Sequence, residues 1–204
     1  MLLVSCATVD QQAAETELSA EEKQALLKKQ QPAHWQQEKQ DRQQIRSWEI
    51  RGRLGIQTKD DGGSMDIIWK QSADEFSIRM IAPMAAGNYH IQGKQDHAEI
   101  RYSDGSSRYI DDINDIFLTL LEVDLPTSAI KDWLRGLPAS EIGIDEVQWN
   151  ELGLINRVRQ SGWNVEMNKY AGAKILLPHS IYISRDDDED LDIRLVLRQW
   201  LLDD

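Results

Sequence analysis

A chain of 204 residues, of which 41% are hydrophobic and 28% charged, can form one globular domain with a sizeable core and a tail, and it requires no second domain. The formal net charge is −12, and the 23 Lys and Arg residues do not cluster along the sequence. This excludes the concentrated cationic surface that nucleic-acid binding needs, and the net charge provides no attraction to an anionic membrane.

The single cysteine, Cys6, excludes an intramolecular disulfide and a thiolate metal site. Leu3-Val4-Ser5-Cys6 is typical of the end of a bacterial lipoprotein signal peptide, in which the cysteine is acylated. The basic start and most of the apolar segment of such a signal are missing. We expect residues 1–6 to be the end of a lipoprotein signal and Cys6 to be the lipidated residue. The alternative is a chance cysteine after a few apolar residues.

The segment that follows, residues 8–44, is rich in Gln, Glu, Lys and Ala and has few β-branched residues, so it cannot form a core of its own. Ser19 followed by Glu22 is a capping-box pattern. It predicts a helix over Ala20–Gln31 that ends before Pro32.

A second helix is predicted over Ala33–Ser47, where it would bury Trp35 and Ile45. Because a lipid anchor needs a spacer, we expect a flexible tether at residues 7–32. The folded domain is expected at residues 33–204.

From Trp48 onward hydrophobic and polar residues alternate, which is the pattern of half-buried strands. The first three strands are joined by short turns and form an antiparallel meander. About eleven strands are predicted, at 48–57, 65–69, 76–80, 89–93, 97–102, 107–110, 147–149, 154–160, 163–169, 180–184 and 191–200. This strand count predicts a mainly β fold with helices. Because a sheet of so many strands does not stay flat, we expect it to curl. An antiparallel, half-open (incomplete) barrel would enclose an apolar interior beneath short α-helices.

Between the two blocks of strands, Leu125–Pro138 predicts a short plug helix. Its apolar residues recur at helical spacing and lie on one face: Ile130, Trp133, Leu134 and Leu137. Gly136 is suited to a left-handed C-terminal cap, and Pro138 prevents the helix from continuing. Together with a helix over Asp111–Leu121, this segment is expected to close the barrel interior.

No catalytic residue, metal ligand or cofactor is expected, because the sequence lacks a nucleophile elbow, a zinc-binding His-Glu-x-x-His pair and a phosphate-binding glycine loop. The histidines are scattered and are interpreted as edge or surface residues: His34, His90, His97 and His179. Asp186–Asp190 lacks the glycine and the bidentate glutamate of a calcium loop, so we interpret it as a solvated hairpin turn.

Several short motifs occur in a defined order between Trp35 and Trp200. The most specific is Leu125-Pro126 followed by Ile130, Trp133-Leu134 and Gly136-Leu137-Pro138. The others are Arg51-Gly52, Trp69, Pro83-Met84, Ser161-Gly162-Trp163, Leu177-Pro178, Ile193-Arg194-Leu195 and Trp200. In these motifs the chain resembles the LolB family of outer-membrane lipoproteins. It departs from the enteric members by Met84 in place of Leu, by the bulkier acidic hairpin and by the short signal.

The resemblance implies a function. LolB-like proteins accept lipoproteins from the periplasmic carrier LolA, hold their acyl chains in an apolar cavity and insert them into the inner leaflet of the outer membrane. The implied partners are therefore a LolA-like carrier, acylated lipoprotein cargo and outer-membrane lipid, with the protein acting as a monomer. Ala7 after the acylated cysteine, in place of the Asp that retains lipoproteins in the inner membrane, implies a lipid anchor in the outer membrane, facing the periplasm.

The inward-facing residues are the candidates for the acyl cavity. They are Trp48, Ile50, Leu54, Met65, Ile67, Trp69, Phe76, Ile78, Met80, Ile91, Ile130, Trp133, Leu134, Ile193, Leu195 and Leu197. The same residues could instead form a dry packed core. In that case the chain would be a structural lipoprotein that tethers a barrel at the outer membrane. An acyl hydrolase, a third possibility, has no nucleophile.

The turn over residues 81–87 carries no charge and no side chain that forms hydrogen bonds. Pro83 restricts its backbone and Gly87 permits the return of the chain, which presents Met84 at the tip. The resemblance implies that Pro83, Met84 and Ala85 form the loop that delivers lipoproteins into the membrane. The alternative is that the loop folds back onto the barrel.

Overall fold

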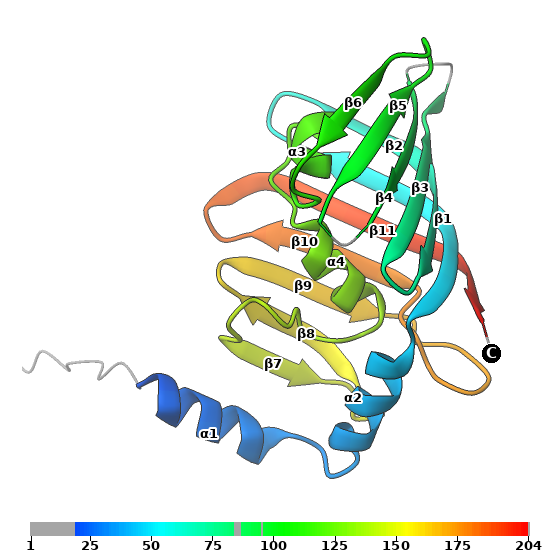
Figure 1. Ribbon diagram of the computed structural model, residues 1–204. Coiled ribbons are helices and arrows are strands. Elements are labelled where there is room, and N and C mark those ends of the chain that lie inside the picture. Colours follow the sequence, from blue (N-terminus) through cyan, green and yellow to red (C-terminus); the bar gives the residue numbers. More distant parts are fainter. Residues whose placement is uncertain (1–18, 84–86, 95, 204) are drawn as a thin grey trace, which may run out of the picture. The chain divides into compact units, whose positions relative to one another are not determined.

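The computed structural model describes residues 19–83, 87–94 and 96–203 (Figure 1). The chain divides into two compact units, residues 1–31 and Pro32–Asp204. The first unit contributes α1 (Ala20–Gln30), which begins at the N-cap Ser19. The Ser19 hydroxyl accepts a hydrogen bond from the backbone N–H of Glu22, and the Glu22 carboxylate accepts one from the backbone N–H of Ser19. The predicted capping box is therefore confirmed. Cys6 lies outside the described residues, and the tether remains a prediction.

The second unit is built on one antiparallel sheet of eleven strands in the order β6-β5-β4-β3-β2-β1-β11-β10-β9-β8-β7. The strands are β1 (Ser47–Gln57), β2 (Gly62–Ser72), β3 (Glu75–Ile81), β4 (Asn88–Gly93), β5 (Ala98–Tyr102), β6 (Ser107–Ile110), β7 (Glu146–Trp149), β8 (Ile155–Gln160), β9 (Trp163–Asn168), β10 (Ser180–Arg185) and β11 (Asp188–Leu202). The end strands β6 and β7 do not pair with each other, so the sheet is open. The predicted incomplete antiparallel barrel is confirmed.

The sheet consists of two meanders joined through the pairing of β1 with β11. We call β1–β6 the first half and β7–β11 the second half. At the junction the register shifts between Arg51 and Gly52. A Cβ at Gly52 would lie 2.3 Å from the backbone oxygen of Val196, so the close approach of β11 requires glycine in the Arg51-Gly52 motif.

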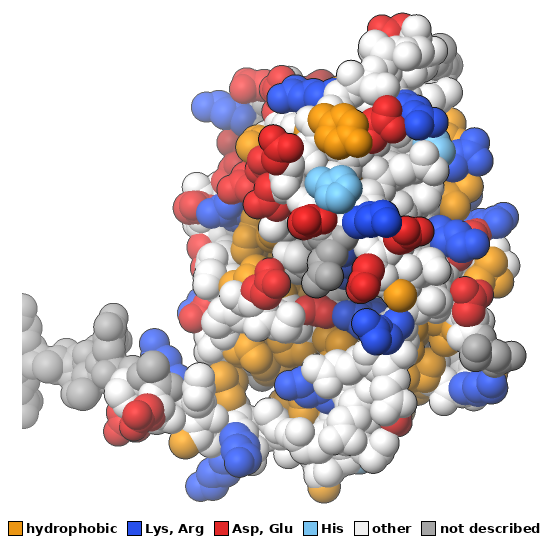
Figure 2. Space-filling view, in the orientation of Figure 1, with side chains coloured by type: hydrophobic (Ala, Val, Ile, Leu, Met, Phe, Trp, Pro, Cys, Tyr) orange, Lys and Arg blue, Asp and Glu red, His pale blue; other side chains and the backbone are white. Residues whose placement is uncertain are grey.

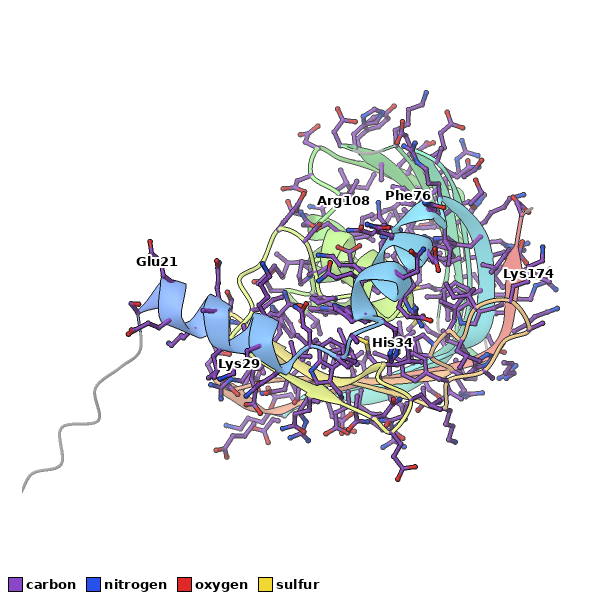
Figure 3. All side chains as sticks on the ribbon, turned by 90° about the horizontal axis from the view of Figure 1, so that it is seen from below. Glu21, Lys29, His34, Phe76, Arg108 and Lys174 are labelled. Carbon is purple, nitrogen blue, oxygen red and sulfur yellow. The ribbon has the colours of Figure 1, made fainter. Side chains whose placement is uncertain are left out.

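Three helices belong to the second unit: α2 (Trp35–Gln44), α3 (Asp115–Leu121) and α4 (Thr127–Leu134). Figures 1 and 3 show α3 and α4 on the concave side of the curved sheet. The predicted helix over Ala33–Ser47 was too long at its C-terminal end. Ile45 has an extended backbone and its N–H bonds to the Arg42 carbonyl, so the chain straightens before β1 begins.

The plug helix is α4, and it ends as predicted. Gly136 has a φ of +76°, and its N–H bonds to the Trp133 carbonyl while that of Leu137 bonds to the Asp132 carbonyl. This pair of hydrogen bonds is a Schellman motif, which satisfies carbonyls that the end of a helix otherwise leaves unpaired. A side chain at Gly136 would also approach the Tyr170 hydroxyl, 3.1 Å from the Cβ position.

The acidic segment is only partly a turn. Asp186 and Asp187 form the connection between β10 and β11, whereas Asp188–Asp190 already belong to β11 and are exposed. The segment is therefore a solvated hairpin, as expected, but the last strand begins earlier than the hydrophobic pattern indicated.

Candidate functional site

The interior of the second unit lies between the concave face of the sheet and α3 and α4. The structure brings the predicted cavity residues together in this one hydrophobic cluster. All of them except Met65, which packs against the margin of the cluster, are at most 4% exposed. Their side chains fill the interior in this structure. An acyl chain could therefore enter only if α4 or neighbouring side chains move, and the cavity remains a prediction.

The second half of the sheet holds α4 through the side chain of Gln160, which is fully buried on β8. The Gln160 carbonyl oxygen accepts the Trp133 indole N–H at 3.1 Å and the Ala139 backbone N–H at 2.8 Å. Its amide group donates to the carbonyls of Ala139 and Ile142 at 2.9 and 2.8 Å. Gln160 thus satisfies all of its own polar atoms while attaching α4 and the following segment to β8.

The first half of the sheet meets α4 differently. The Lys131 ammonium lies over the Phe76 ring of β3, 5.2 Å from its centroid, and otherwise the helix faces this half through apolar side chains. Burial, and then the charge of Arg135, lower the pKa of Lys131. Among the residues described, no hydrogen bond joins α4 to β1–β6.

The C-terminal end of α4 is fixed by arginines. Arg135 donates to the Ile45 carbonyl at 3.1 Å and pairs with Asp132. The fully buried Arg42 of α2 donates to the Leu176 carbonyl at 2.8 Å and pairs with Glu38. Arg135 thus joins the C-terminal turn of α4 to the segment before β1, while at its first turn Ser128 donates its backbone N–H and hydroxyl to Asn114.

Neither Gln160 nor Arg42 is among the residues predicted from the sequence. Gln160 follows Val158 at the inward position of a strand, which is the one available signal, since a polar residue there must find partners. Arg42 lies in a helix of mainly polar residues and carried no comparable signal.

Four buried side-chain polar atoms have no hydrogen-bond partner among the described residues: Arg42 Nε, Trp69 Nε1, Gln71 Oε1 and Thr127 Oγ1. Trp69 and Gln71 are inward-facing residues of β2, and Thr127 begins α4. An unpaired buried polar group costs about 1–3 kcal/mol. Unpaired groups therefore occur on β2, at the start of α4 and beside its C-terminal cap, whereas the polar atoms of Gln160 on β8 are all paired.

An open pocket of about 640 Å³ lies where β1 ends and β2 begins. Its apolar walls are formed by Ile56 of β1, Met65 of β2, and Leu120 and Leu121 at the end of α3, all of which pack against the margin of the core. Acidic residues also line it: Asp60, Asp61, Glu122 and Asp188. Hydrophobic side chains are also visible at the surface between charged ones in Figure 2.

The 81–87 turn lies at the same end of the sheet, because Asp66 and Ile81 form the last pair of β2 with β3. The Ala82 N–H bonds to the Gly87 carbonyl at 3.2 Å and closes the stem of the turn. Gly87 has a φ of +139°, as expected for the residue that returns the chain. Pro83 is exposed, whereas Met84 and Ala85 lie outside the described residues.

Within residues 19–83, 87–94 and 96–203, no group of three or more His, Cys, Asp or Glu residues could hold a metal ion. No helix in the described ranges is long and apolar enough to cross a membrane.

A family model described as outer membrane lipoprotein LolB matches residues 46–200 of this chain. The outer-membrane lipoprotein LolB of Alkalilimnicola ehrlichii is 30% identical over 156 residues, which are 76% of this chain and 76% of that protein. The outer-membrane lipoprotein LolB of Ectopseudomonas mendocina is 29% identical to this chain over 170 residues, which are 83% of this chain and 81% of the relative.

Two solved structures have a similar fold. A LolA superfamily protein from Nitrosomonas europaea aligns with a TM-score of 0.57 and 9% identity, over 83% of this chain and 93% of that one. A putative outer membrane lipoprotein-sorting protein domain from Vibrio parahaemolyticus aligns with a TM-score of 0.53 and 9% identity, over 81% and 91% of the two chains. At this identity the likeness concerns the fold alone.

Proposed function

Since this chain belongs to the LolB family of outer-membrane lipoproteins, we propose that it accepts acylated lipoproteins from a LolA-like periplasmic carrier and inserts them into the inner leaflet of the outer membrane. The observation that carries the proposal is the apolar interior between the concave sheet and α4. This interior has the residue composition that acyl chains require.

The energetics explain why such an interior is needed. Transfer of apolar groups out of water is favourable by roughly 0.8 kcal/mol per methylene, so exposing a lipid anchor of several chains would cost on the order of tens of kcal/mol. A carrier must therefore pass the chains from one apolar site to another. No nucleotide is needed if each receiver binds the chains better than the one before and the bilayer binds them best.

The acyl chains are proposed to lie between α4 and the first half of the sheet. Moving α4 away from β1–β4 breaks apolar contacts, one cation–π contact and, at the C-terminal end, the hydrogen bond of Arg135 to the Ile45 carbonyl, whereas moving it away from β8 breaks the buried hydrogen bonds of Gln160. The ester and amide groups of a lipoprotein anchor could also pair with the unsatisfied atoms of Trp69 and Gln71.

The 81–87 turn is proposed to enter the membrane during delivery, with Pro83, Met84 and Ala85 as the inserting residues. The stem of the turn is uncharged and Pro83 is exposed. The pocket formed by β1, β2 and α3, with walls that are partly apolar and partly acidic, lies at the same end of the sheet, so chains leaving the interior there would emerge near the membrane.

Cys6 is proposed to carry the acyl chains that anchor the protein itself. One chain anchors only weakly, whereas several anchor stably. The full chain with Cys6→Ala should therefore move from the membrane to the soluble fraction, while Ser5→Ala should not. If the Cys6→Ala chain remained in the membrane fraction, the anchor would be wrong.

The transfer assay tests the proposed function directly. The purified chain is mixed with a carrier–lipoprotein complex, and the cargo bound to each protein is measured after separation. Cargo should move to this chain and then to added liposomes without nucleotide. A folded chain that takes up no cargo would instead be a structural tether, a role that the family membership does not favour.

A further inference from the structure

The outer face of the first half carries a row of basic side chains. Arg79 on β3 lies opposite His90 on β4, and His90 lies opposite Arg101 on β5. Their strand neighbours Ile78, Met80, Ile91 and Ile100 are buried in the interior, so the three basic side chains project from the other face. Arg79 and Arg101 are exposed and His90 is half-buried. We call Arg79, His90 and Arg101 the cationic row.

The cationic row concentrates positive charge. Arg101 pairs with Glu99 at 3.0 Å, but no carboxylate in the described part of the chain lies within ion-pair distance of Arg79. The other polar partner of the row is the Ser77 hydroxyl, 3.1 Å from His90 Nε2. Burial, and then the charges of Arg79 and Arg101, lower the pKa of His90. The charge of the row is therefore carried by Arg79 and Arg101, which lie on either side of His90, and an anion between them would offset their repulsion.

The position of the row next to the 81–87 turn indicates what that anion is. Together with Ile81 and Asn88, which form the last pair before the turn, the row lines a shallow pocket of about 540 Å³ on the sheet. Ile81 is 39% exposed, so an apolar residue lies among the cations at the end that carries the turn. Basic groups beside exposed apolar ones are typical of surfaces that bind anionic membranes.

We propose that the cationic row binds the phosphate groups of anionic phospholipids at the membrane surface. The inference deepens the proposed function and rests on it, because the delivery role of the turn is itself a proposal. Guanidinium groups suit phosphate oxygens because they donate two parallel hydrogen bonds. The row orients the hairpin on the membrane despite the net charge of −12.

Vesicle binding of the full chain carrying Cys6→Ala tests the proposal, since this variant cannot be acylated. Vesicles of phosphatidylcholine are compared with vesicles of equal parts phosphatidylcholine and phosphatidylglycerol. Arg79→Gln and Arg101→Gln should each weaken binding to the anionic vesicles about fivefold at low salt. Binding to phosphatidylcholine should not change, and Arg79→Lys, which keeps the charge but not the paired hydrogen bonds, should restore only part of the binding to anionic vesicles.

Arg159→Gln is the matched control. Arg159 is an exposed arginine on β8, opposite Glu146 and Asn164 instead of other cations, and its loss should leave binding unchanged. Equal binding of the Arg79→Gln, Arg101→Gln and Arg159→Gln chains to anionic vesicles would overturn the proposal.

The imidazole of His90 supplies a second readout. Soluble dihexanoyl-phosphatidylglycerol should raise the pKa of His90, measured by NMR, because a phosphate beside the imidazole offsets the charges of Arg79 and Arg101. Dihexanoyl-phosphatidylcholine, whose phosphate is neutralised by its own choline, should raise it less. An equal shift with both lipids, or none, would contradict a site for anionic lipid.

Cargo transfer to phosphatidylcholine vesicles separates this inference from the proposed function. If the Arg79→Gln and Arg101→Gln chains bind anionic vesicles normally but no longer take cargo from the carrier, the row contacts an acidic protein and the lipid proposal is wrong. If the unsubstituted chain transfers no cargo while the arginine variants still lose anionic-vesicle binding, the proposed function fails and the lipid site stands.

Discussion

The two halves of the sheet hold α4 in different ways. The second half is joined to it by the buried Gln160 of β8, which bonds to Trp133 and to the segment after the helix. The first half meets the helix through apolar side chains and the contact of Lys131 with Phe76. Buried hydrogen bonds are costly to break, whereas apolar contacts can be replaced by contacts with an acyl chain.

The acyl-binding site that we propose depends on this difference. If the helix pivots on its attachment to β8, the boundary with β1–β4 opens and the side chains there contact the ligand. Gln71, whose Oε1 is unpaired, lines a pocket on this boundary together with Lys131 and Arg135. The same half carries the 81–87 turn, so uptake and delivery would use one side of the molecule.

The largest loss of stability is expected from Gln160→Leu. The change leaves four groups without partners, the Trp133 indole N–H, the Ala139 N–H and carbonyl, and the Ile142 carbonyl, at about 1–3 kcal/mol each, so we expect a loss of at least about 4 kcal/mol. The free energies of unfolding of this variant and of the unsubstituted chain are compared by urea denaturation. Gln148→Leu, at an exposed position of β7, should change stability by less than about 0.5 kcal/mol. Similar values for the two variants would remove the distinction between the halves.

Met84→Glu should block delivery without affecting the attachment of α4. A carboxylate at the centre of a bilayer costs about 2.5–3.5 kcal/mol, which corresponds to a decrease in release to liposomes of about a hundredfold. Uptake of cargo from the carrier should be nearly unchanged, and Met84→Leu should deliver normally. Normal delivery by Met84→Glu would refute the insertion role of the turn.

Gly136→Ala should have a smaller effect, at the fixed C-terminal end of α4. The left-handed backbone at this position costs a non-glycine residue about 1–2 kcal/mol, and the new methyl group would also approach Tyr170. Gly143→Ala is the control, because a Cβ there meets no atom within 4 Å. Equal melting temperatures for the two variants would show that the Schellman motif does not stabilise this end.

Lys131→Met should have the smallest effect on stability. It removes a cation–π contact worth about 0.5–1 kcal/mol but keeps the apolar stem of the side chain against Phe76. Lys70→Met, on the outer face of β2, supplies the comparison. A loss as large as that of Gln160→Leu would mean that both halves hold α4 equally firmly, and the proposed opening would be wrong.

The fold could be predicted from the sequence because its signals are local. Alternation beginning at Trp48 and Ile50 marks the strands, and Gly136 followed by Pro138 marks the end of α4. The end of α2 could not be predicted, since the pairing of Ser47 with Ser72 in β1 and β2 decides it. Tertiary pairing overrides helix propensity at such boundaries.

The attachments of α4 were not predictable for a related reason. Gln160 and Arg42 have the residue types of a protein surface, and only the folded chain reveals that they are buried among carbonyl groups. The cavity residues had the opposite limitation. Ile50 or Ile78 would be hydrophobic in a packed core and in an acyl-binding site alike, so residue type identifies the interior but not its use.

Photo-crosslinking of the cargo tests the central claim most directly. A lipoprotein with a diazirine in its acyl chain is transferred from the carrier to this protein and irradiated, and the crosslinked residues are identified by mass spectrometry. The account predicts crosslinks to Ile130 or Leu134 of α4 and to inward residues of β1–β4 such as Ile50 and Ile78. Crosslinks confined to exposed hydrophobic residues, such as Leu118 and Leu152, would contradict it.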